Sequence, residues 1–518
     1  MNSQAFHLAS RIPRQLCLVA LLSALSVMGC ATNGEEVIER PDYEPIREAI
    51  PLPREPASHF GIEDFVGEPL VDAPLAPYDK PENPFLDAAG SARVHNDSYN
   101  TGSYRRSGVL GPNVEVLSTH IDEVGSIGVC ATLVFDKRGF VFGSCIVNAN
   151  EVRLVMLDPE TMDLLAVQSL GPRPFLATSA AGGYFSFDSE QRIIIGTARQ
   201  QIERWAIEEV DGQPQFVQDG VRDLTDYLGD ADILPGDTVV DWQGRVWFMT
   251  NTGIVGYLSF DDDTIVTVDM AEELHNSMAV DETGVYFATF EALYKVQVDE
   301  AGEIDVAWRK PYEKGSDSSG GLTVATGTTP TIFGSRNDLI TICDNADEQI
   351  HMLVWDTTTG DEVCKIPLFQ PGNSATENSA TAYVNDLVIA NSAGFAGPFT
   401  PARDMSTGME RWTVREDRSG CDLVWRNEDM EADSSQLAIN TGVLYGYGTD
   451  RSIEDEDVFN LYAIDWDTGE EIFRAYVGNG VPFDTITGQP HVHPDGGRIF
   501  LSGSNGIAQI YDVDESSP

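Results

Sequence analysis

The chain has 518 residues, of which 83 are acidic and 32 basic, so its formal net charge is −51 and its isoelectric point is near 4.2. A surface this negative repels phosphate backbones and anionic headgroups, which argues against binding to nucleic acid and against electrostatic docking to membranes. The acidic surplus either attracts cations or keeps the surface solvated in saline surroundings.

The N-terminus carries Arg11 and Arg14, then an apolar run from Leu16 to Met28, then the tetrapeptide "VMGC" ending at Cys30. This order is typical of a secretory signal peptide, with an apolar run too short to span a bilayer. The small residue before Cys30 resembles the lipobox of bacterial lipoproteins. The resemblance implies a signal over residues 1–29 and a lipid on Cys30. The alternative is a plain cleaved signal peptide.

Ala31 follows the cysteine, in place of the Asp associated with retention at the inner membrane of bacteria. We therefore expect an anchor at the outer membrane, on its periplasmic or its surface side. Residues 30–90 are rich in Pro and acidic residues, as in "RPDYEPIREAIPLPREPASHF", and we expect an extended linker there. The remaining part, about 430 residues over 91–518, is too long for one ordinary core and suggests two domains or a repeat architecture.

Eight hairpins recur along this part, each with two apolar strands around a short turn built from Asp, Asn or Gly. They include "TLVFDKRGFVFGS", "TVVDWQGRVWFMT" and "VHPDGGRIFLSG". The turns lie near Asp136, Asp188, Asp241, Asp281, Asn337, Asn385, Asn440 and Asp495. Their spacing of roughly 40 to 55 residues is the blade period of a β-propeller. We predict an all-β propeller of eight blades, with seven as the alternative, closed by the N-terminal strand "NVEVLSTHI".

A second turn recurs between the hairpins, in "LDPETMDLLA", "WDTTTGDEVC" and "DWDTGEEIF". An Asp and a Thr can accept hydrogen bonds from turn amides, while Gly takes the positive φ. The pattern resembles the repeat of quinoprotein-like (PQQ-type) propellers, in which a Trp four residues after the Gly docks between blades. Here that position holds Phe473, Cys364 or Ala166. A further copy offers Trp412, while "EDRSGCDLVW" competes for the same role.

Polar residues gather where the chain leads into the first strand of a blade or leaves the second, and these loops open on one face, which we call the top face. Positions leading in are Asp237, His275, Asn276, Glu377, Asn378 and His491, and positions leading out are Asn148, Asn150, Asn251, Asp344, Asn345 and Asn391. Carboxylate and amide oxygens suit Ca²⁺, and we take the metal ligands to be Glu377, Asn378, Asn276, Asp344, Asn345 and Asp237. The alternative is that these residues serve the turns themselves.

The stretch "LHNSMAVDETGVYFAT" resembles the Asn-bearing strand start of gluconolactonase, paraoxonase and strictosidine-synthase-like propellers. The resemblance implies a central metal that polarises a lactone or ester carbonyl, with Asn276 as the matching ligand. Glu377 and Asp344 match by side-chain type and position, and His491 or His275 would serve as general base.

Cys130 and Cys145 flank the turn at residues 137 and 138 symmetrically, which predicts a cross-strand disulfide. The pairing of Cys343, Cys364 and Cys421 stays open. The sequence has no GxSxG, Walker, HExxH or CxxCH motif, and it lacks the adjacent cysteines of PQQ alcohol dehydrogenases, so we expect no PQQ.

Two functions follow from these patterns. The first is a lipid-anchored extracytoplasmic propeller whose top face binds a ligand or an envelope protein partner, as in the propeller lipoprotein of outer-membrane assembly. The second is a Ca²⁺-dependent lactonase or esterase with its metal at the propeller mouth.

Overall fold

The computed structural model describes residues 40–78, 80–88, 91–124, 126–173, 183–229, 234, 237–316, 323–395, 400–430, 433–485 and 489–513. The predicted signal peptide and Cys30 lie outside these residues. No helix within the described residues is long and apolar enough to cross a membrane.

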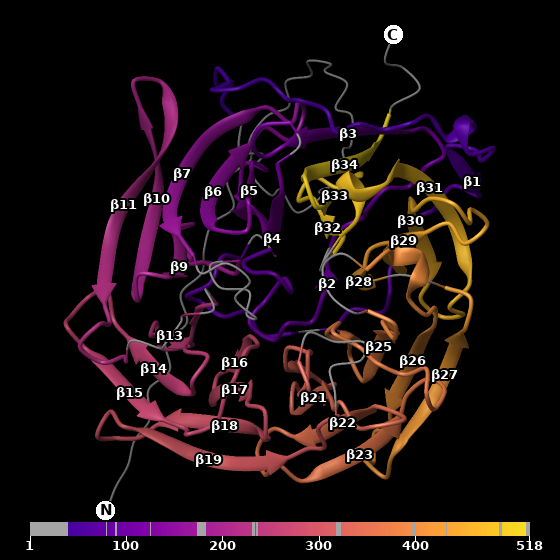
Figure 1. The fold of residues 1–518 in the computed structure, drawn as a ribbon. Coiled ribbons are helices and arrows are strands. Elements are labelled where there is room, and N and C mark those ends of the chain that lie inside the picture. The colour runs from indigo at the N-terminus through magenta and orange to yellow at the C-terminus, as the bar shows by residue number, and fades with distance from the viewer. Residues whose placement is uncertain are drawn as a thin grey trace, which may run out of the picture. The chain divides into compact units, whose positions relative to one another are not determined.

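Eight antiparallel sheets stand around one axis, each with four blade strands and with the first strand of the blade nearest the axis (Figure 1). Blades 1 and 2 comprise β4 (Gly128–Phe135), β5 (Val141–Val147), β6 (Glu151–Leu157), β7 (Leu164–Pro172), β8 (Ser186–Phe187), β9 (Ile193–Thr197), β10 (Gln201–Val210) and β11 (Gln213–Asp223). Blades 3 and 4 comprise β12 (Val239–Val240), β13 (Val246–Met249), β14 (Ile254–Leu258), β15 (Ile265–Asp269), β16 (Met278–Asp281), β17 (Gly284–Ala288), β18 (Ala292–Val298) and β19 (Ile304–Pro311).

Blades 5 and 6 comprise β20 (Thr331–Phe333), β21 (Leu339–Cys343), β22 (His351–Asp356), β23 (Glu362–Pro367), β24 (Thr381–Tyr383), β25 (Asp386–Ala390), β26 (Met409–Val414) and β27 (Cys421–Asn427). Blades 7 and 8 comprise β28 (Asp433–Ala438), β29 (Val443–Thr449), β30 (Val458–Asp465), β31 (Glu471–Asn479), β32 (His491–Val492), β33 (Arg498–Ser502), β34 (Gly506–Asp512) and β3 (Val114–His120). Short 3-10 helices cover Ala57–His59, Ala402–Asp404 and Val481–Phe483.

The ring is closed by strands from both parts of the chain. β3 pairs antiparallel with β34, from Val114 opposite Asp512 to His120 opposite Gly506. This pairing supplies the outer strand that blade 8 would otherwise lack. The prediction of eight blades closed by an N-terminal strand is confirmed, and the seven-blade alternative is wrong.

The predicted Asp turns act as caps for the inner hairpins. One carboxylate oxygen of Asp136 accepts hydrogen bonds from the amides of Arg138 (2.9 Å) and Phe140 (3.0 Å). Asp241 does the same for Gln243 (2.9 Å) and Arg245 (3.0 Å). These bonds satisfy turn amides that would otherwise lack acceptors, which explains why Asp recurs at this place in the repeat.

The second turns also form as expected. Gly360 and Gly469 have positive φ angles of 66° and 75°, and Met162 holds the same conformation at 64° in the first copy. The docking Trp, however, comes from the preceding blade. Trp425 packs on Gly469 and donates to the carbonyl of Trp466 at 2.9 Å, so "EDRSGCDLVW" and not Trp412 fills this role.

The disulfides join neighbouring strands and neighbouring blades. Cys130 and Cys145 lie opposite each other on β4 and β5 and are bonded, as predicted. Cys364 of β23 is bonded to Cys421 of β27, which ties the outer strand of blade 5 to that of blade 6. Cys343 is free and buried.

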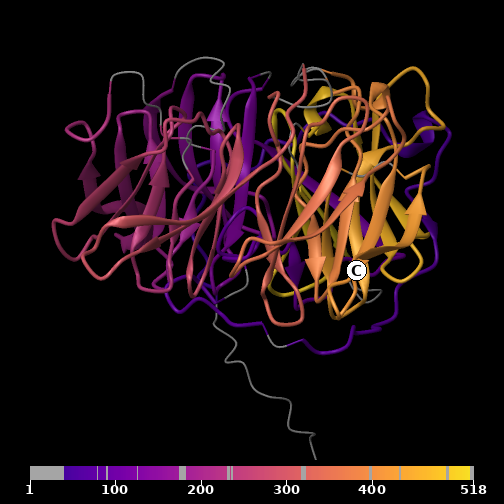
Figure 2. The ribbon, with the colours of Figure 1, turned by 90° about the horizontal axis from the view of Figure 1, so that it is seen from below.

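The chain before the ring is extended, yet it packs on the ring over much of its length. We call residues 40–88 the arm. It runs along the outer edge and one face of the ring (Figure 2), and β1 (Phe65–Gly67) adds a strand to β31. On this face, the bottom face, Tyr78 of the arm donates to the carbonyl of Gly334 at 2.6 Å. The sequence predicts a linker free of the domain here. Buried Leu52 and Tyr43 explain the difference, because both place apolar surface against the blades.

Candidate functional site

Residues 91–104, which we call the axial segment, run through the central part of the ring (Figure 1), and all of them except Asp97 are buried. Its carbonyls accept hydrogen bonds from the first strands of blades 2, 4, 5, 6 and 7: Phe187 donates to Ala92, Val280 to Ser98, Ile332 to Tyr99, Ala382 to Thr101 and Leu437 to Gly102, at 2.8–2.9 Å. The segment ends in β2 (Ser103–Tyr104), which lies parallel to β28. The chain itself therefore lines and closes the axial channel.

Arg93 of the axial segment binds one of the predicted metal ligands. One guanidinium nitrogen donates to both carboxylate oxygens of Asp237 at 3.0 Å, and the other donates to the carbonyl of Met278 at 2.8 Å. Ser277 adds a further hydrogen bond to Asp237 at 2.6 Å. The side chains of Arg93 and Asp237 are 0% and 1% exposed, so the carboxylate is neutralised by an internal cation within a closed site.

His95 connects polar residues of four blades. Its Nδ1 accepts from the amide of Gln489 at 2.7 Å, and Gln489 in turn accepts from Gln436 at 2.7 Å. Because Gln489 donates to Nδ1, the proton of His95 is on Nε2, which lies 3.2 Å from the hydroxyl of Thr329. Thr329 donates to Asn276 Oδ1 at 3.0 Å, so this predicted ligand is also engaged.

The histidines of the site are held neutral by burial. Burial lowers the pKa of His95 to about 4, and burial beside the His95 ring lowers the pKa of His491 to about 3. His491 is 3% exposed, and its Nδ1 has no partner among the described residues. His493 points elsewhere and donates to the carbonyl of Gly139 at 2.8 Å, so the two neighbours do not converge. His275 packs edge-on against Phe290, and burial lowers its pKa.

Asp344 is directed toward the outer strands of its own blade, whereas Asn345 contacts the loop ahead of the first strand. Asp344 accepts from the backbone amide of His351 at 2.6 Å and lies 3.0 Å from its Nδ1, with Lys365 of β23 at 3.7 Å. Burial raises the pKa of Asp344. Asn345 donates to the carbonyl of Thr323 at 3.2 Å. Both residues leave β21 on the top face, as predicted, and Asp344 is held there by partners of its own blade.

Glu377 and Asn378 lie at the mouth of the channel, half-buried. The Glu377 carboxylate packs on Gly327, where a side chain would collide with it. Burial, together with the charges of Asp237 and Glu377, raises the pKa of the Tyr184 phenol to about 12. Tyr184 thus belongs to the same mouth, although nothing in its sequence context distinguishes it.

The remaining predicted polar residues shape loops. Asn391 accepts from the amides of Ala375 (3.2 Å) and Ala393 (3.1 Å), and Asn148 has a positive φ of 49° in a turn. The backbones of Asn150 and Asn251 take part in turn hydrogen bonds. Within the described residues, no group of three or more His, Cys, Asp or Glu side chains could hold a metal ion.

Arg93 and His95 are the residues of this site that the sequence analysis missed. They lie in "SARVHNDSYNTGSY", a polar stretch outside the repeats that resembles a loop or linker. The sequence feature that could have pointed to them is an Arg and a His within a run of small polar residues, ahead of the strand that closes the ring.

No known family profile matches the chain. A curated protein of Archaeoglobus fulgidus, described as an uncharacterized protein, is 22% identical over 342 residues, which cover 57% of this chain and 64% of that protein. The match thus spans less than two thirds of that relative.

Among solved structures, BamB from Moraxella catarrhalis aligns with a TM-score of 0.43 and 11% identity over 78% of this chain and 99% of its own. The β-propeller domain of Myceliophteria thermophila Cps50 (Swd1) aligns with a TM-score of 0.39 and 10% identity over 78% and 99%. Similarity at this level carries no information on ligand or partner.

Proposed function

We propose that this protein is a lipid-anchored, extracytoplasmic propeller that binds a protein partner or a ligand at its top face. The observation that supports a binding function over a hydrolytic one is the ion pair between Arg93 and Asp237. A metal needs Asp237 as a free carboxylate, and Arg93 already occupies both of its oxygens.

The choice of face rests on the arm. It crosses the bottom face and contacts the hairpin turns there, as Tyr78 does at Gly334 and Arg40 does at the carbonyl of Arg138 (2.8 Å). The top face carries the loops that lead into and out of the blades, and loops on a rigid scaffold are where binding residues concentrate. A net charge of −51 would steer a partner with a basic surface toward it.

Thermal unfolding of the purified protein after EDTA treatment and after addition of Ca²⁺ separates the two functions. If the protein is a binding propeller with a closed channel, Ca²⁺ should shift the Tm of the unmodified protein no more than that of Glu377→Gln. A rise in Tm that Glu377→Gln abolishes, together with turnover of lactones or aryl esters, would favour the hydrolase instead.

Partner binding is tested by placing a photo-crosslinking amino acid at one of two positions of this protein, expressed in cells. Asn251 on the top face is expected to give a crosslinked product, and Asn440 in a bottom-face turn serves as the matched control. Crosslinking from Asn440 alone would overturn the choice of face. Loss of detergent-phase partitioning in Cys30→Ser tests the anchor.

A further inference from the structure

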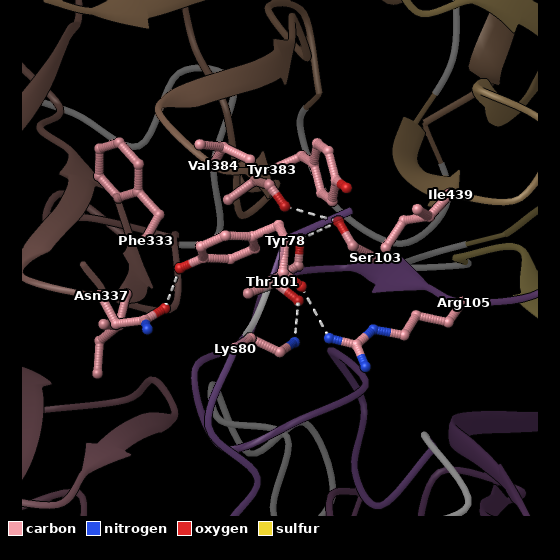
Figure 3. A pocket seen from close by; sticks show the side chains of 12 residues that line it. Tyr78, Lys80, Thr101, Ser103, Arg105, Phe333, Asn337, Tyr383, Val384 and Ile439 are labelled. Carbon is pink, nitrogen blue, oxygen red and sulfur yellow. Dashed lines mark hydrogen bonds between the residues drawn. The ribbon is translucent and has the colours of Figure 1, made fainter. Parts of the chain in front are cut away.

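A pocket on the bottom face carries two cations in an otherwise acidic protein (Figure 3). It lies between the arm, the axial segment and the first strands of blades 5, 6 and 7, with a cavity volume of about 40 Å³ that is partly open to solvent. Its cationic side chains are Lys80 and Arg105, and its apolar lining includes Phe333, Val384 and Ile439.

The two cations of this pocket differ in their partners. Lys80 forms an ion pair with Asp97 and also donates to the Thr101 hydroxyl at 3.2 Å. Arg105 donates to the carbonyl of Tyr78 at 2.9 Å, and no carboxylate of the described residues forms an ion pair with it. The guanidinium of Arg105 therefore has no carboxylate partner among the described residues and keeps donors available for an incoming anion.

The two phenols beside the cations are fixed as walls. Tyr78 donates to the carbonyl of Gly334, and Tyr383 donates to the carbonyl of Ala76. Because both hydroxyl protons are engaged with carbonyls, these rings offer apolar surface to a ligand, and the anion must be bound by Arg105 and Lys80. A planar carboxylate can accept two parallel hydrogen bonds from a guanidinium, which a spherical anion cannot match as well.

We propose that this pocket binds a small organic carboxylate, with the carboxylate on Arg105 and Lys80 and a short apolar body against Phe333, Val384 and Ile439. The carboxylate of Asp97 competes with the ligand for Lys80, because the two side chains already form an ion pair. The site lies on the face opposite the proposed partner surface and does not depend on that proposal.

Calorimetric titration of the purified protein with benzoate tests the site, with benzamide and inorganic phosphate as separate arms. Benzoate is expected to bind, and Arg105→Gln to weaken it at least about tenfold, as loss of a charge-assisted hydrogen bond implies. Benzamide, which has the same ring without the charge, is expected to bind at least about tenfold more weakly. Phosphate lacks the apolar body and is expected to bind more weakly than benzoate.

Two further variants sharpen the test. Asp97→Asn keeps the Oδ1 acceptor that holds the amide of Tyr99 at 2.9 Å and frees Lys80, so it is expected to tighten benzoate binding several-fold. Lys314→Gln removes one positive charge near the top face, where Lys314 pairs with Glu291, and is expected to change nothing. The proposal is overturned if benzoate does not bind, if phosphate or benzamide binds as well as benzoate, or if Lys314→Gln weakens binding as much as Arg105→Gln.

Discussion

Asp237 shows how one residue changes its role once its partner is known. Its position ahead of a first strand suits a metal ligand, but Arg93, from a distant part of the chain, donates hydrogen bonds to both of its carboxylate oxygens. The pair is enclosed, so each charge depends on the other for stability. This makes the ion pair a structural element that fixes the axial segment to blades 3 and 4.

Replacing one member of this pair is expected to be costly. Asp237→Asn leaves Arg93 buried without its counter-charge and should lower the free energy of unfolding by about 3–5 kcal/mol in denaturant titrations. The double variant Arg93→Gln/Asp237→Asn should recover part of that loss. The control Arg336→Gln breaks a surface pair with Asp338 and should cost less than about 1 kcal/mol. Equal costs for Asp237→Asn and Arg336→Gln would contradict the role given to this pair.

The buried histidines predict a loss of stability in acid. The folded-state pKa values of His95, His491 and His493 are lowered to about 4, 3 and 4, below the usual 6.5 of an exposed histidine. The unfolded chain therefore binds protons first, and stability is lost as the pH falls from about 6.5 toward 4. Each such histidine contributes a slope of up to about 1.4 kcal/mol per pH unit.

His95→Gln isolates this effect, because Gln can still pair with Gln489 and Thr329 but does not titrate. The free energy of unfolding of this variant should fall less steeply between pH 6.5 and 4 than that of the unmodified protein. Identical slopes would show that His95 is not held neutral. The raised pKa of Asp344 acts in the opposite direction and is common to both proteins, so it does not affect the difference.

At the scale of elements, the outer strands of blades 5 and 6 are joined covalently as well as by packing. The Cys364–Cys421 disulfide closes a segment of 57 residues, whereas Cys130–Cys145 closes 15 within one hairpin. A longer closed loop removes more entropy from the unfolded chain, so the first bond should contribute roughly 4 kcal/mol and the second roughly 3 kcal/mol.

Paired Cys→Ala variants test this ranking by denaturant titration under oxidising conditions. The variant without Cys364 and Cys421 should unfold at lower denaturant than the variant without Cys130 and Cys145. The opposite ranking of the two disulfide variants would mean that local strand contacts outweigh loop entropy here.

Cys343 is buried and burial raises the pKa of its thiol, so it should not react with a thiol reagent until the protein unfolds.

The parts of the fold that repeat could be predicted from the sequence. Asp136 and Asp241 mark their turns because each Asp satisfies local amides, and alternating apolar strands mark the hairpins. Arg93 and His95 could not be predicted, since their partners lie on blades far away in the chain. Glu377 was placed at the mouth by topology alone, while the direction of Asp344 depends on His351, a contact no spacing reveals.

At the scale of the whole molecule, closure of the ring stabilises the folded state and the net charge destabilises it. The pairing of β3 with β34 closes the ring, whereas the charges that sum to −51 repel one another within the compact state. Salt shortens the range of that repulsion, from about 30 Å at 0.01 M to about 10 Å at 0.1 M.

The Tm is therefore expected to rise between 0.01 M and 0.5 M NaCl, as followed by circular dichroism. An uncharged osmolyte at the same osmolality serves as the control for general exclusion effects. A Tm that falls with NaCl would mean that attractive ion pairs, such as that of Arg138 with Asp136, outweigh the repulsion.

Hydrogen exchange of the purified protein tests the central claim most directly, which is that the axial segment closes the channel as an integral part of the ring. Peptides covering residues 91–104 are expected to exchange as slowly as the first strands that donate to them, because amides such as Ala92 and Gly102 are themselves hydrogen-bonded. Exchange of 91–104 at the rate of an unstructured chain, with β16 and β20 still protected, would contradict the account and reopen the channel as a site for metal or substrate.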